Sequence, residues 1–501
     1  MVQMRKWRPL LKLDDSASQA SYRKIAEGLV TAIVEGRLPP GTLLPGTREM
    51  AQLLDVNRKT VILAYEEAMT KGWLVSEPRR GTFVNAQLTA KQLPSRAQAP
   101  FAPPILAQTT APYFAQNAQV TALNHRHDAL FFDNGTSDHR LLPQAVLHRY
   151  YRNALRNSFA SNTLRYGSEG TGYHLRCALA EMLRNNRGLT VNAENICLTQ
   201  GTQMSLYLTA SLLLKPGDVV LVERLSYPPA WEIFRRLGAQ LVTVDIDEEG
   251  CRTDQIDRLC REHKVRMIYL TPHHQFPTTV SLHAARRQQL LALAALHDFC
   301  IIEEDYDHEF HFSGRPYLPL ASDRAQRHVI YVGSLSKVLG STFRCSYVVA
   351  PTQVVEALHS NAALMLGDAD AVAQKMLADL INDGELKKHL RRVSKEYRAR
   401  RETLQDCLQA AFGDRIQVRE PEGGLALWVR FDDAIDVDQI VSAALDHGLV
   451  VRSGRQFSPM DQAENALRLG FASLNQEEIR EATLRLAQAA SPHAHKNADH
   501  H

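Results

Sequence analysis

The sequence predicts a multidomain protein: a small α+β head of helices and a β-hairpin, then a large α/β body with a mostly parallel sheet. Residues 20–84 carry three amphipathic helix patterns, followed by two short apolar runs around a Pro-Arg-Arg-Gly turn. Beyond residue 129, apolar runs of strand length alternate with helix patterns, which is typical of parallel sheets. Residues 85–127 hold five prolines and no Asp or Glu, a composition that favours a linker.

We therefore expect a DNA-binding head at residues 10–84, a linker at 85–128 and a body at 129–490. A smaller C-terminal α+β domain should begin at about residue 368, and the tail at 491–501 should be disordered. The 501 residues can bury more than one core, and their composition, 45% hydrophobic and 23% charged, is ordinary for a globular protein. No bilayer-length apolar run or secretory leader is present, so we expect a cytoplasmic protein. The seven scattered cysteines indicate neither disulfides nor a zinc site, and no metal site is expected. The histidines of the tail could bind metal, but we expect them to have no role.

The head has the spacing of a helix-turn-helix with a wing. Thr47 should cap the second helix, Asn57 the third, and Gly72 should end the third helix. The three-residue link at 55–57 has the length that a helix-turn-helix needs, and the turn at 78–81 gives the hairpin a basic tip.

Charge and position together indicate DNA binding by the head. Residues 1–84 carry thirteen Lys and Arg against nine Asp and Glu, whereas the whole chain has a net charge of only +3. The N-terminal turn of the third helix should enter the major groove, where Arg58 can bond a guanine edge with two nitrogens. For any single residue the alternative is a solvated basic surface. The DNA-binding candidates are Arg48, Arg58, Lys59, Thr60, Arg79, Arg80 and Thr82.

The stretch 331–351 carries the chemistry of the body. An apolar strand at 329–332 enters a turn that delivers Lys337, with the hydroxyls of Ser334 and Ser336 beside it and Arg344 seven residues on. An amine among hydroxyls and a guanidinium suits a phosphorylated aldehyde, because the amine can form a Schiff base while the other groups hold the phosphate.

Upstream, the strand at 301–310 ends in a cluster of acids. Strand alternation places Glu304 and Tyr306 on one face and turns Asp305 away. With pyridoxal 5'-phosphate (PLP), such an acid would keep the pyridine nitrogen protonated and the phenol would bond the ring hydroxyl. Asp305 is the alternative acid if the register differs. At a strand-to-helix turn, Gly201 allows close approach, and Thr202 and Gln203 offer donors to an anion.

These motifs resemble two known families in one chain. The strand with Glu304 and Tyr306 and the Lys337 loop resemble the fold-type I PLP enzymes, the aspartate aminotransferase family. Residues 22–84 resemble the GntR-type winged helix-turn-helix along their whole length, and the combination resembles the MocR subfamily of GntR regulators. The resemblance implies a PLP cofactor, a double-stranded DNA operator, a small-molecule amino effector or PLP itself as ligand, and a head-to-tail homodimer whose two heads read paired half-sites.

The resemblance also implies further site residues. Tyr227 should stack on the pyridine ring, and Arg468 should pair with a substrate or effector carboxylate, for which a structural ion pair is the alternative. The full set of cofactor-binding candidates is Lys337, Glu304, Tyr306, Tyr227, Gly201, Thr202, Gln203, Gln275, Ser334, Ser336, Arg344 and Tyr166.

The sequence departs from the family pattern at several positions. Glu304 stands where an aspartate is usual, Ser341-Thr342 replaces a Pro-Gly pair, Thr279 replaces a glycine and Leu225 a proline. In the head, Gly46 falls where the family usually has a serine. These changes leave cofactor binding in place and make efficient turnover less assured.

Two functions follow. The first is a PLP-binding transcriptional regulator that senses PLP or an amino compound through a Schiff base at Lys337. The second is a working PLP-dependent aminotransferase with an accessory DNA-binding module, which turnover with a keto acid would favour. A purely structural module fits poorly with Lys337 and its surroundings.

Overall fold

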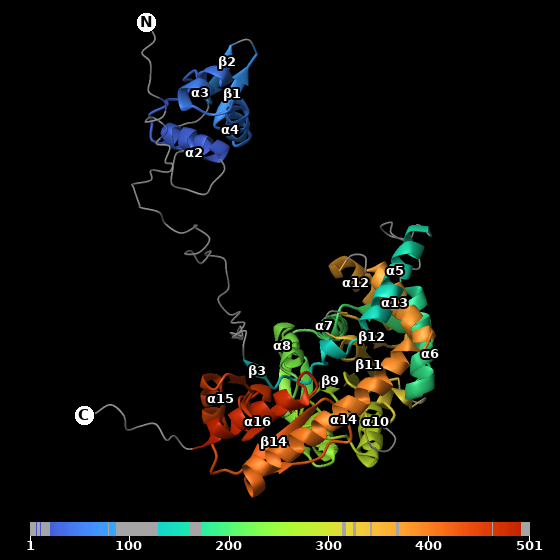
Figure 1. The fold of residues 1–501 in the computed structure, drawn as a ribbon. Helices are drawn as coiled ribbons and strands as arrows, with labels where there is room; N and C mark the ends of the chain where they lie inside the picture. Colours follow the sequence, from blue (N-terminus) through green and yellow to red (C-terminus); the bar gives the residue numbers. More distant parts are fainter. Residues whose placement is uncertain are drawn as a thin grey trace, which may run out of the picture. The chain divides into compact units, whose positions relative to one another are not determined.

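A computed structural model divides the chain into two compact units, Met1–Ala122 and Leu123–His501 (Figure 1). It describes residues 7, 11, 21–78, 80–86, 129–160, 172–312, 317–323, 327–340, 343–366, 370–462 and 464–491. The predictions for most of the linker, for nearly all of the tail, and for Arg79, Tyr166 and Ser341-Thr342 lie outside these residues. Within the described ranges, no helix is both long and apolar enough to cross a membrane.

The head is a winged helix-turn-helix, as the sequence predicts. Its elements are α2 (Ser21–Val34), α3 (Thr47–Leu54), α4 (Arg58–Thr70), β1 (Leu74–Glu77) and β2 (Gly81–Val84), with β1 and β2 antiparallel. Ile25, Leu29, Met50 and Val61 belong to a hydrophobic cluster formed within this unit. The head therefore has a core of its own, which is what an independent domain requires.

Helix capping in the head follows one prediction and contradicts another. The Asn57 side chain accepts a hydrogen bond from the Lys59 amide at 2.8 Å, so it caps α4 as expected. Thr47 does not cap α3: the cap is Gly46, whose carbonyl already accepts from the Met50 amide at 2.8 Å. The helix thus begins one residue earlier than predicted, and the Thr47 hydroxyl instead lies 3.4 Å from Arg58 Nε.

The body is built on a seven-stranded sheet. In spatial order the strands are β4 (Ile196–Thr199), β12 (Ser346–Val349), β11 (Val329–Ser334), β10 (Cys300–Asp305), β9 (Val265–Leu270), β5 (Val219–Glu223) and β6 (Gln240–Val244). Only β12 runs antiparallel to its neighbours, so the mostly parallel sheet of the prediction is confirmed. The carboxyl ends of the parallel strands meet along one edge, where ligand sites form in such sheets.

Helices cover both faces of this sheet (Figure 1). The helices of this part of the chain are α5 (Gln144–Ala160), α6 (Tyr173–Arg187), α7 (Thr202–Leu213), α8 (Pro228–Arg236), α9 (Thr253–Glu262), α10 (Ala284–His297), the four-residue α11 (Ser336–Leu339), α12 (Thr352–Leu366) and α13 (Ala371–Asn382). The long α14 (Glu385–Phe412) follows and contributes most of its buried residues to the core of the smaller domain. A short hairpin, β7 (Ile246–Asp247) with β8 (Gly250–Cys251), follows β6. Alternate residues of one strand face opposite layers: on β5, Val220 packs with Phe234 of α8, whereas Leu221 packs with Leu290 of α10.

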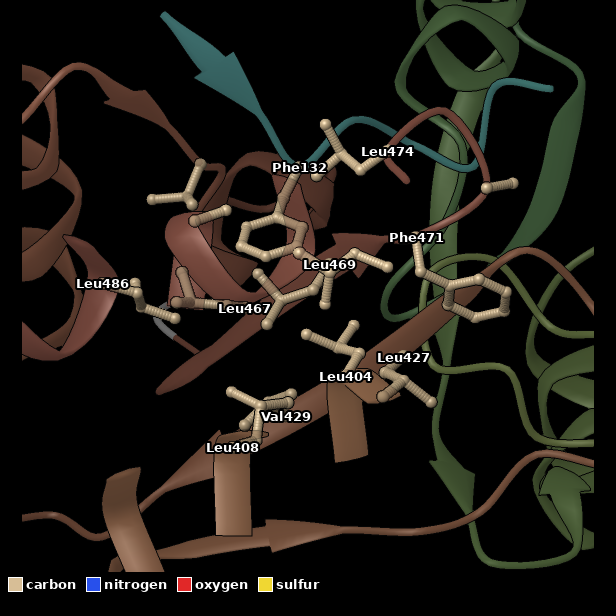
Figure 2. Packing of buried hydrophobic residues seen from close by; sticks show 14 of the residues in the cluster. Phe132, Leu404, Leu408, Leu427, Val429, Leu467, Leu469, Phe471, Leu474 and Leu486 are labelled. Carbon is tan, nitrogen blue, oxygen red and sulfur yellow. The ribbon is translucent and has the colours of Figure 1, made fainter. Parts of the chain in front are cut away.

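A smaller α+β domain completes the body. Its sheet is β13 (Ile416–Val418), β14 (Ala426–Phe431) and β16 (Ala466–Gly470), antiparallel throughout, with helices α15 (Val437–Asp446) and α16 (Gln476–Ala490). The start of the body also joins it, because β3 (Leu130–Phe131) pairs with β15 (Leu449–Val450). Figure 2 shows the Phe132 ring packed among Leu467 and Leu469 of β16, facing side chains of α14 and β14.

Candidate functional site

A cavity of about 180 Å³ opens at the carboxyl ends of the parallel strands. It is lined by Asn134, Thr202, Tyr227, Tyr269, Thr271, Phe276, Glu304, Tyr306, Ser334, Ser336 and Lys337. Seven of these eleven residues are candidates from the sequence. Segments far apart in the chain therefore supply one site, as expected for the edge of a parallel sheet.

Lys337 lies on α11, the short helix that follows β11. Its Nζ donates to the Gly135 carbonyl at 2.6 Å and lies 3.4 Å from the Asn134 carbonyl. Burial lowers the pKa of the Lys337 amine, although nearby Asp133 opposes the shift. A lysine held by carbonyls, with its charge disfavoured by burial, is suited to act as a nucleophile once it loses a proton.

Glu304 lies at the end of β10 on another wall of the same cavity. The Tyr269 hydroxyl donates to Glu304 Oε2 at 2.5 Å, and burial raises the pKa of Glu304 to about 7. Tyr306 is on the same wall, and its hydroxyl donates to the His274 carbonyl at 3.0 Å. The acid and the phenol thus share a face, which is the arrangement that strand alternation predicts.

Asp305 lies on the opposite side of β10 and does not reach the cavity. Its Oδ2 accepts from the Tyr331 hydroxyl at 2.7 Å and lies 3.0 Å from His308 Nδ1 and 3.8 Å from Arg187 Nη1. These cationic and hydrogen-bonding neighbours lower the pKa of Asp305 against the effect of burial. Because Asp305 belongs to a buried network, the geometry leaves Glu304 as the acid that faces the cavity.

The hydroxyl and guanidinium groups gather where β11 and β4 end. Ser334 Oγ accepts from the Ser336 amide at 3.1 Å, and both side chains line the cavity. Gly201 precedes α7 with φ of +90°, and a Cβ there would lie 2.7 Å from Arg344 Nη2. Glycine is therefore needed for the close approach of Arg344, and the amides at the start of α7 add to an anion-binding corner.

Two further cofactor candidates, Tyr227 and Gln275, are placed differently relative to the cavity. Tyr227 lines the cavity, where burial raises the pKa of its phenol to about 12, and exposed Gln203 lies 3.5 Å from its hydroxyl. Gln275 does not face the cavity. Its Nε2 donates to Glu223 Oε2, at 3.1 Å, and to two backbone carbonyls, while its Oε1 accepts from the Thr278 amide and hydroxyl. The side chain of Gln275 therefore holds the loop after β9.

Arg468, on β16, brings a buried guanidinium close to the cavity. Its Nη1 donates to the Pro277 carbonyl at 2.6 Å, Nη2 lies 3.5 Å from the Tyr306 hydroxyl, and the guanidinium sits 4.4 Å from the centre of the Phe276 ring. Among the described residues no carboxylate lies within ion-pair distance of Arg468, and its buried Nε has no hydrogen-bond partner. The structural ion pair that the sequence left open is therefore absent from this part of the chain.

Two family departures have structural consequences. Thr279 occupies the left-handed region with φ of +64°, where a glycine would be unstrained. Leu225 is fully buried, and its carbonyl accepts from Gln275 Nε2 at 2.7 Å.

In the head, most of the DNA-binding candidates lie on or next to two elements. Arg58, Lys59 and Thr60 form the first turn of α4, and Arg58 and Lys59 are exposed. Arg48 is exposed on α3, and Arg80 and Thr82 lie on the hairpin. Arg80 donates to Glu77 at 2.6 Å, so part of its charge is already paired. The third wing residue, Arg79, falls outside the described residues.

Sequence reasoning missed several residues of the cavity. The carbonyls that hold Lys337 come from Asn134 and Gly135, about two hundred positions away, and no spacing in the sequence indicates that pairing. Tyr269, which donates to Glu304, precedes the polar loop after β9, and its position at a strand end is a signal that could have been used. Phe276 was also missed, because an apolar residue in a loop offers no distinctive pattern.

The geometry defines a class of protein: a winged helix-turn-helix joined to an α/β body of the aminotransferase kind. Residues 135–486 match the family described as aminotransferase class I and II, and residues 21–84 match the bacterial regulatory proteins of the gntR family. The chain belongs to the aminotransferase class I and II family, a PLP-binding family, and with its gntR-type head it is a transcriptional regulator of the MocR type. The resemblance seen in the sequence is thereby confirmed.

Individual relatives share this organisation. Over 96% of the chain it is 29% identical to the probable rhizopine catabolism regulatory protein MocR of Rhizobium meliloti, covering 96% of that protein. It is also 29% identical to the HTH-type regulator YhdI of Bacillus subtilis, across 96% of this chain and 98% of YhdI. Among solved structures, the α-aminoadipate aminotransferase LysN of Thermus thermophilus, complexed with N-(5'-phosphopyridoxyl)-L-leucine, is 26% identical with a TM-score of 0.67, covering 72% of this chain and 92% of that one.

Proposed function

We propose that this protein is a DNA-binding regulator whose body binds PLP at Lys337 and senses PLP or an amino compound that reacts with it. The observation that carries the proposal is the buried Lys337 amine sharing one cavity with Glu304, in a chain that begins with a winged helix-turn-helix. We propose that it acts in the cytoplasm, where its operator would be found.

The groups around the cavity fit PLP. When bound, PLP supplies an aldehyde that condenses with the Lys337 amine and a ring that withdraws electrons from the amino compound. Glu304 would hold the proton of the pyridine nitrogen, and its pKa of about 7 lets it share that proton near neutral pH. The phosphate would bind Ser334, Ser336, Thr202 and the amides that follow Gly201, with Arg344 supplying the positive charge.

The buried guanidinium of Arg468 indicates what kind of effector the body would take. Its charge faces no carboxylate among the described residues, and its Nε has no hydrogen-bond partner there. A carboxylate from outside would supply both the counter-charge and the acceptor. We therefore propose an effector that carries an amine and a carboxylate, as an amino acid does.

Signalling would then use two states of the body. The effector can shift DNA affinity only by binding one state more tightly than the other, and movement of the smaller domain, which carries Arg468, is the proposed difference. We also propose a head-to-tail homodimer, so that two heads read paired half-sites.

Absorption spectroscopy tests the cofactor. Purified protein incubated with PLP should develop a visible absorption band that survives dialysis, and Lys337→Ala should abolish it because Lys337 is the one lysine among the described residues that line the cavity. Lys215→Ala, on the exposed Lys215 after α7, is the matched control and should keep the band. A band that persists in Lys337→Ala would contradict the proposal.

Binding to duplex DNA tests the head. With a duplex selected from a random pool, Arg58→Ala should weaken binding by about 1–3 kcal/mol and relax the preference at one base pair, as for a lost bidentate contact. Arg23→Ala on α2 should have little effect, because Arg23 lies outside the turn that enters the groove. Equal affinities of the Arg58 variant and the wild type would rule out the proposed groove contact.

An aminotransferase is the second candidate, favoured by Lys337 and Arg468 lying near one cavity. It predicts repeated turnover of an amino acid with a keto acid. A single partial conversion of bound cofactor, together with saturable DNA binding, would favour the regulator instead.

A further inference from the structure

Four histidines cluster beside the cavity, outside the groups that would hold PLP. His273 and His274 follow β9, and His308 and His311 follow β10. The ring of His273 lies 4.2 Å from that of His274, 4.6 Å from that of His308 and 5.9 Å from that of His311, centre to centre. One nitrogen from each of His273, His274 and His311 can be chosen so that all three lie within 4.8 Å of one another.

The hydrogen bonding of His274 leaves one nitrogen available. Its Nδ1 lies 2.7 Å from Asp307 Oδ1, and since a carboxylate can only accept, Nδ1 carries the proton. The lone pair is then on Nε2, which is buried and has no hydrogen-bond partner among the described residues. A carboxylate behind an imidazole is the common second contact of histidines that bind metals, because it fixes the tautomer and raises the basicity of the ring.

His273 has even fewer hydrogen bonds than His274. It is 5% exposed, and within the described residues neither of its ring nitrogens has a hydrogen-bond partner. A buried polar group without a partner is destabilising, and coordination to a cation would offset that cost.

The backbone at Gly423 packs closely against the ring of His274. A Cβ at Gly423 would lie 2.7 Å from His274 Nε2 and 2.3 Å from the Phe310 carbonyl, so only glycine allows this approach. His311 is less buried than His273 and His274, so the cluster is partly exposed on the side of His311. His311 also forms a backbone bridge with Gly423.

We propose that His273, His274 and His311 form a binding site for a divalent transition metal, Zn²⁺ in the first instance, with Asp307 as the outer partner of His274. Imidazole is a preferred ligand of zinc, cobalt and nickel, and three histidines with a water as the fourth ligand are a common zinc ligand set. No short sequence motif indicates this site, because its ligands come from two loops more than thirty residues apart.

The location of the site gives it a structural consequence. His311 and Gly423 join the loop after β10 to the segment before β14 of the smaller domain, and the Gly424 amide donates to the Phe310 carbonyl at 2.7 Å. The carbonyl of His274 accepts from Tyr306 on the cavity wall. A bound metal would therefore tie the smaller domain to the strand ends that shape the cavity.

Cobalt titration of the full-length protein tests the proposal. The background variant carries His493→Ala, His495→Ala, His500→Ala and His501→Ala, which removes the histidines of the tail but leaves the cluster intact. After chelation and dialysis, addition of Co²⁺ should give d–d absorption that saturates at one equivalent and disappears when Zn²⁺ competes. His311→Gln and His273→Gln should each weaken Co²⁺ binding at least about tenfold, and Asp307→Asn about tenfold.

His297→Gln is the matched control, because His297 pairs with Asp257 on another face and should bind Co²⁺ like the background. Circular dichroism checks that each variant is folded, and the partly exposed His311 provides a test if His273→Gln does not fold. As a second readout, Zn²⁺ should raise the melting temperature of the background and not that of His311→Gln. Failure of the background to bind Co²⁺, or unchanged binding in both histidine variants, would overturn the site. None of these readouts depends on PLP.

Discussion

Buried carboxylates without a full counter-charge are a feature of the strand ends in this protein. Glu223 and Glu303 are each 1% exposed, and burial raises the pKa of Glu223 to about 8 and that of Glu303 to about 7. Glu304 has the same property at the cavity. The folded state therefore holds protons that the unfolded chain releases at lower pH, and stability depends on pH in a defined direction.

The direction follows from proton binding. Between the ordinary pKa of a glutamate and pH 8, folded Glu223 binds a proton and unfolded Glu223 does not, so the free energy of unfolding falls as pH rises, by about 1.4 kcal/mol per pH unit for such a group. In Glu223→Gln that part of the slope should vanish. Urea unfolding of the body at several pH values from 5 to 8 measures it, with Glu402→Gln, at an exposed position of α14, as control. Parallel pH profiles of Glu223→Gln and wild type would refute the buried-proton explanation.

Thr279 shows the cost of a departure from the family pattern. A β-branched residue at φ of +64° is strained by about 1 kcal/mol or more, and glycine adopts this conformation freely. Thr279→Gly should raise the free energy of unfolding of the body by up to about 1 kcal/mol, less the entropy that glycine adds to the unfolded chain. Thr279→Ala keeps a Cβ and should gain less. Denaturant midpoints of the three proteins report the order, and a loss of stability in Thr279→Gly would contradict it.

At the scale of elements, the start of α4 is the point where the fold of the head and its proposed contact with DNA coincide. Asn57 caps the helix, and Arg58, Lys59 and Thr60 form the turn that follows. The cap satisfies an amide that would otherwise lack a partner at the helix end, so it also holds the turn in the orientation that a groove contact needs.

Asn57→Ala should therefore destabilise the head by about 1 kcal/mol. Hydrogen exchange of the full-length protein should show faster exchange in α4, while the strands of the body remain unchanged. Asn57→Ser keeps a side-chain acceptor and should exchange like wild type. Faster exchange in the serine variant as well would mean that the amide group is needed for something other than the cap.

At the scale of the whole molecule, the head and the body have separate hydrophobic cores. The cluster of the head includes Ile25, Leu29 and Val61, whereas the clusters of the body are built from its own strands and helices. Two separate cores imply two unfolding transitions, and a ligand of the body should act on only one of them.

Calorimetry in the absence of DNA tests this independence. PLP at one hundred times its dissociation constant should stabilise the body by about 2.7 kcal/mol and leave the transition of the head in place. Lys337→Ala should show no shift of either transition. A single transition that moves as a whole would show that the two units unfold together.

Much of the site could be predicted because it depends on local order. Alternation along β10 places Glu304 and Tyr306 together, the turn after β11 presents Lys337, and Asn57 precedes a helix in the position of a cap. Each of these depends on residues within a few positions, where backbone geometry fixes what faces where.

Other features could not be predicted because neighbours in space decide them. Gln275 stands next to the site in sequence, but buried Glu223 accepts its amide and turns it away from the cavity. Thr47 has the chemistry of a helix cap and is displaced because the Gly46 carbonyl already begins α3.

By itself, the sequence determined the order of the two units, the elements of each, and the lysine, acid and phenol of the cavity, because strand and helix periods are local properties of the chain. Only the tertiary structure decided that Gly135 holds Lys337, that Arg468 is buried without a carboxylate partner among the described residues, and that three histidines from two loops meet. Those contacts join positions that no spacing relates, and only the pairing of strands and the packing of the folded body bring them within reach.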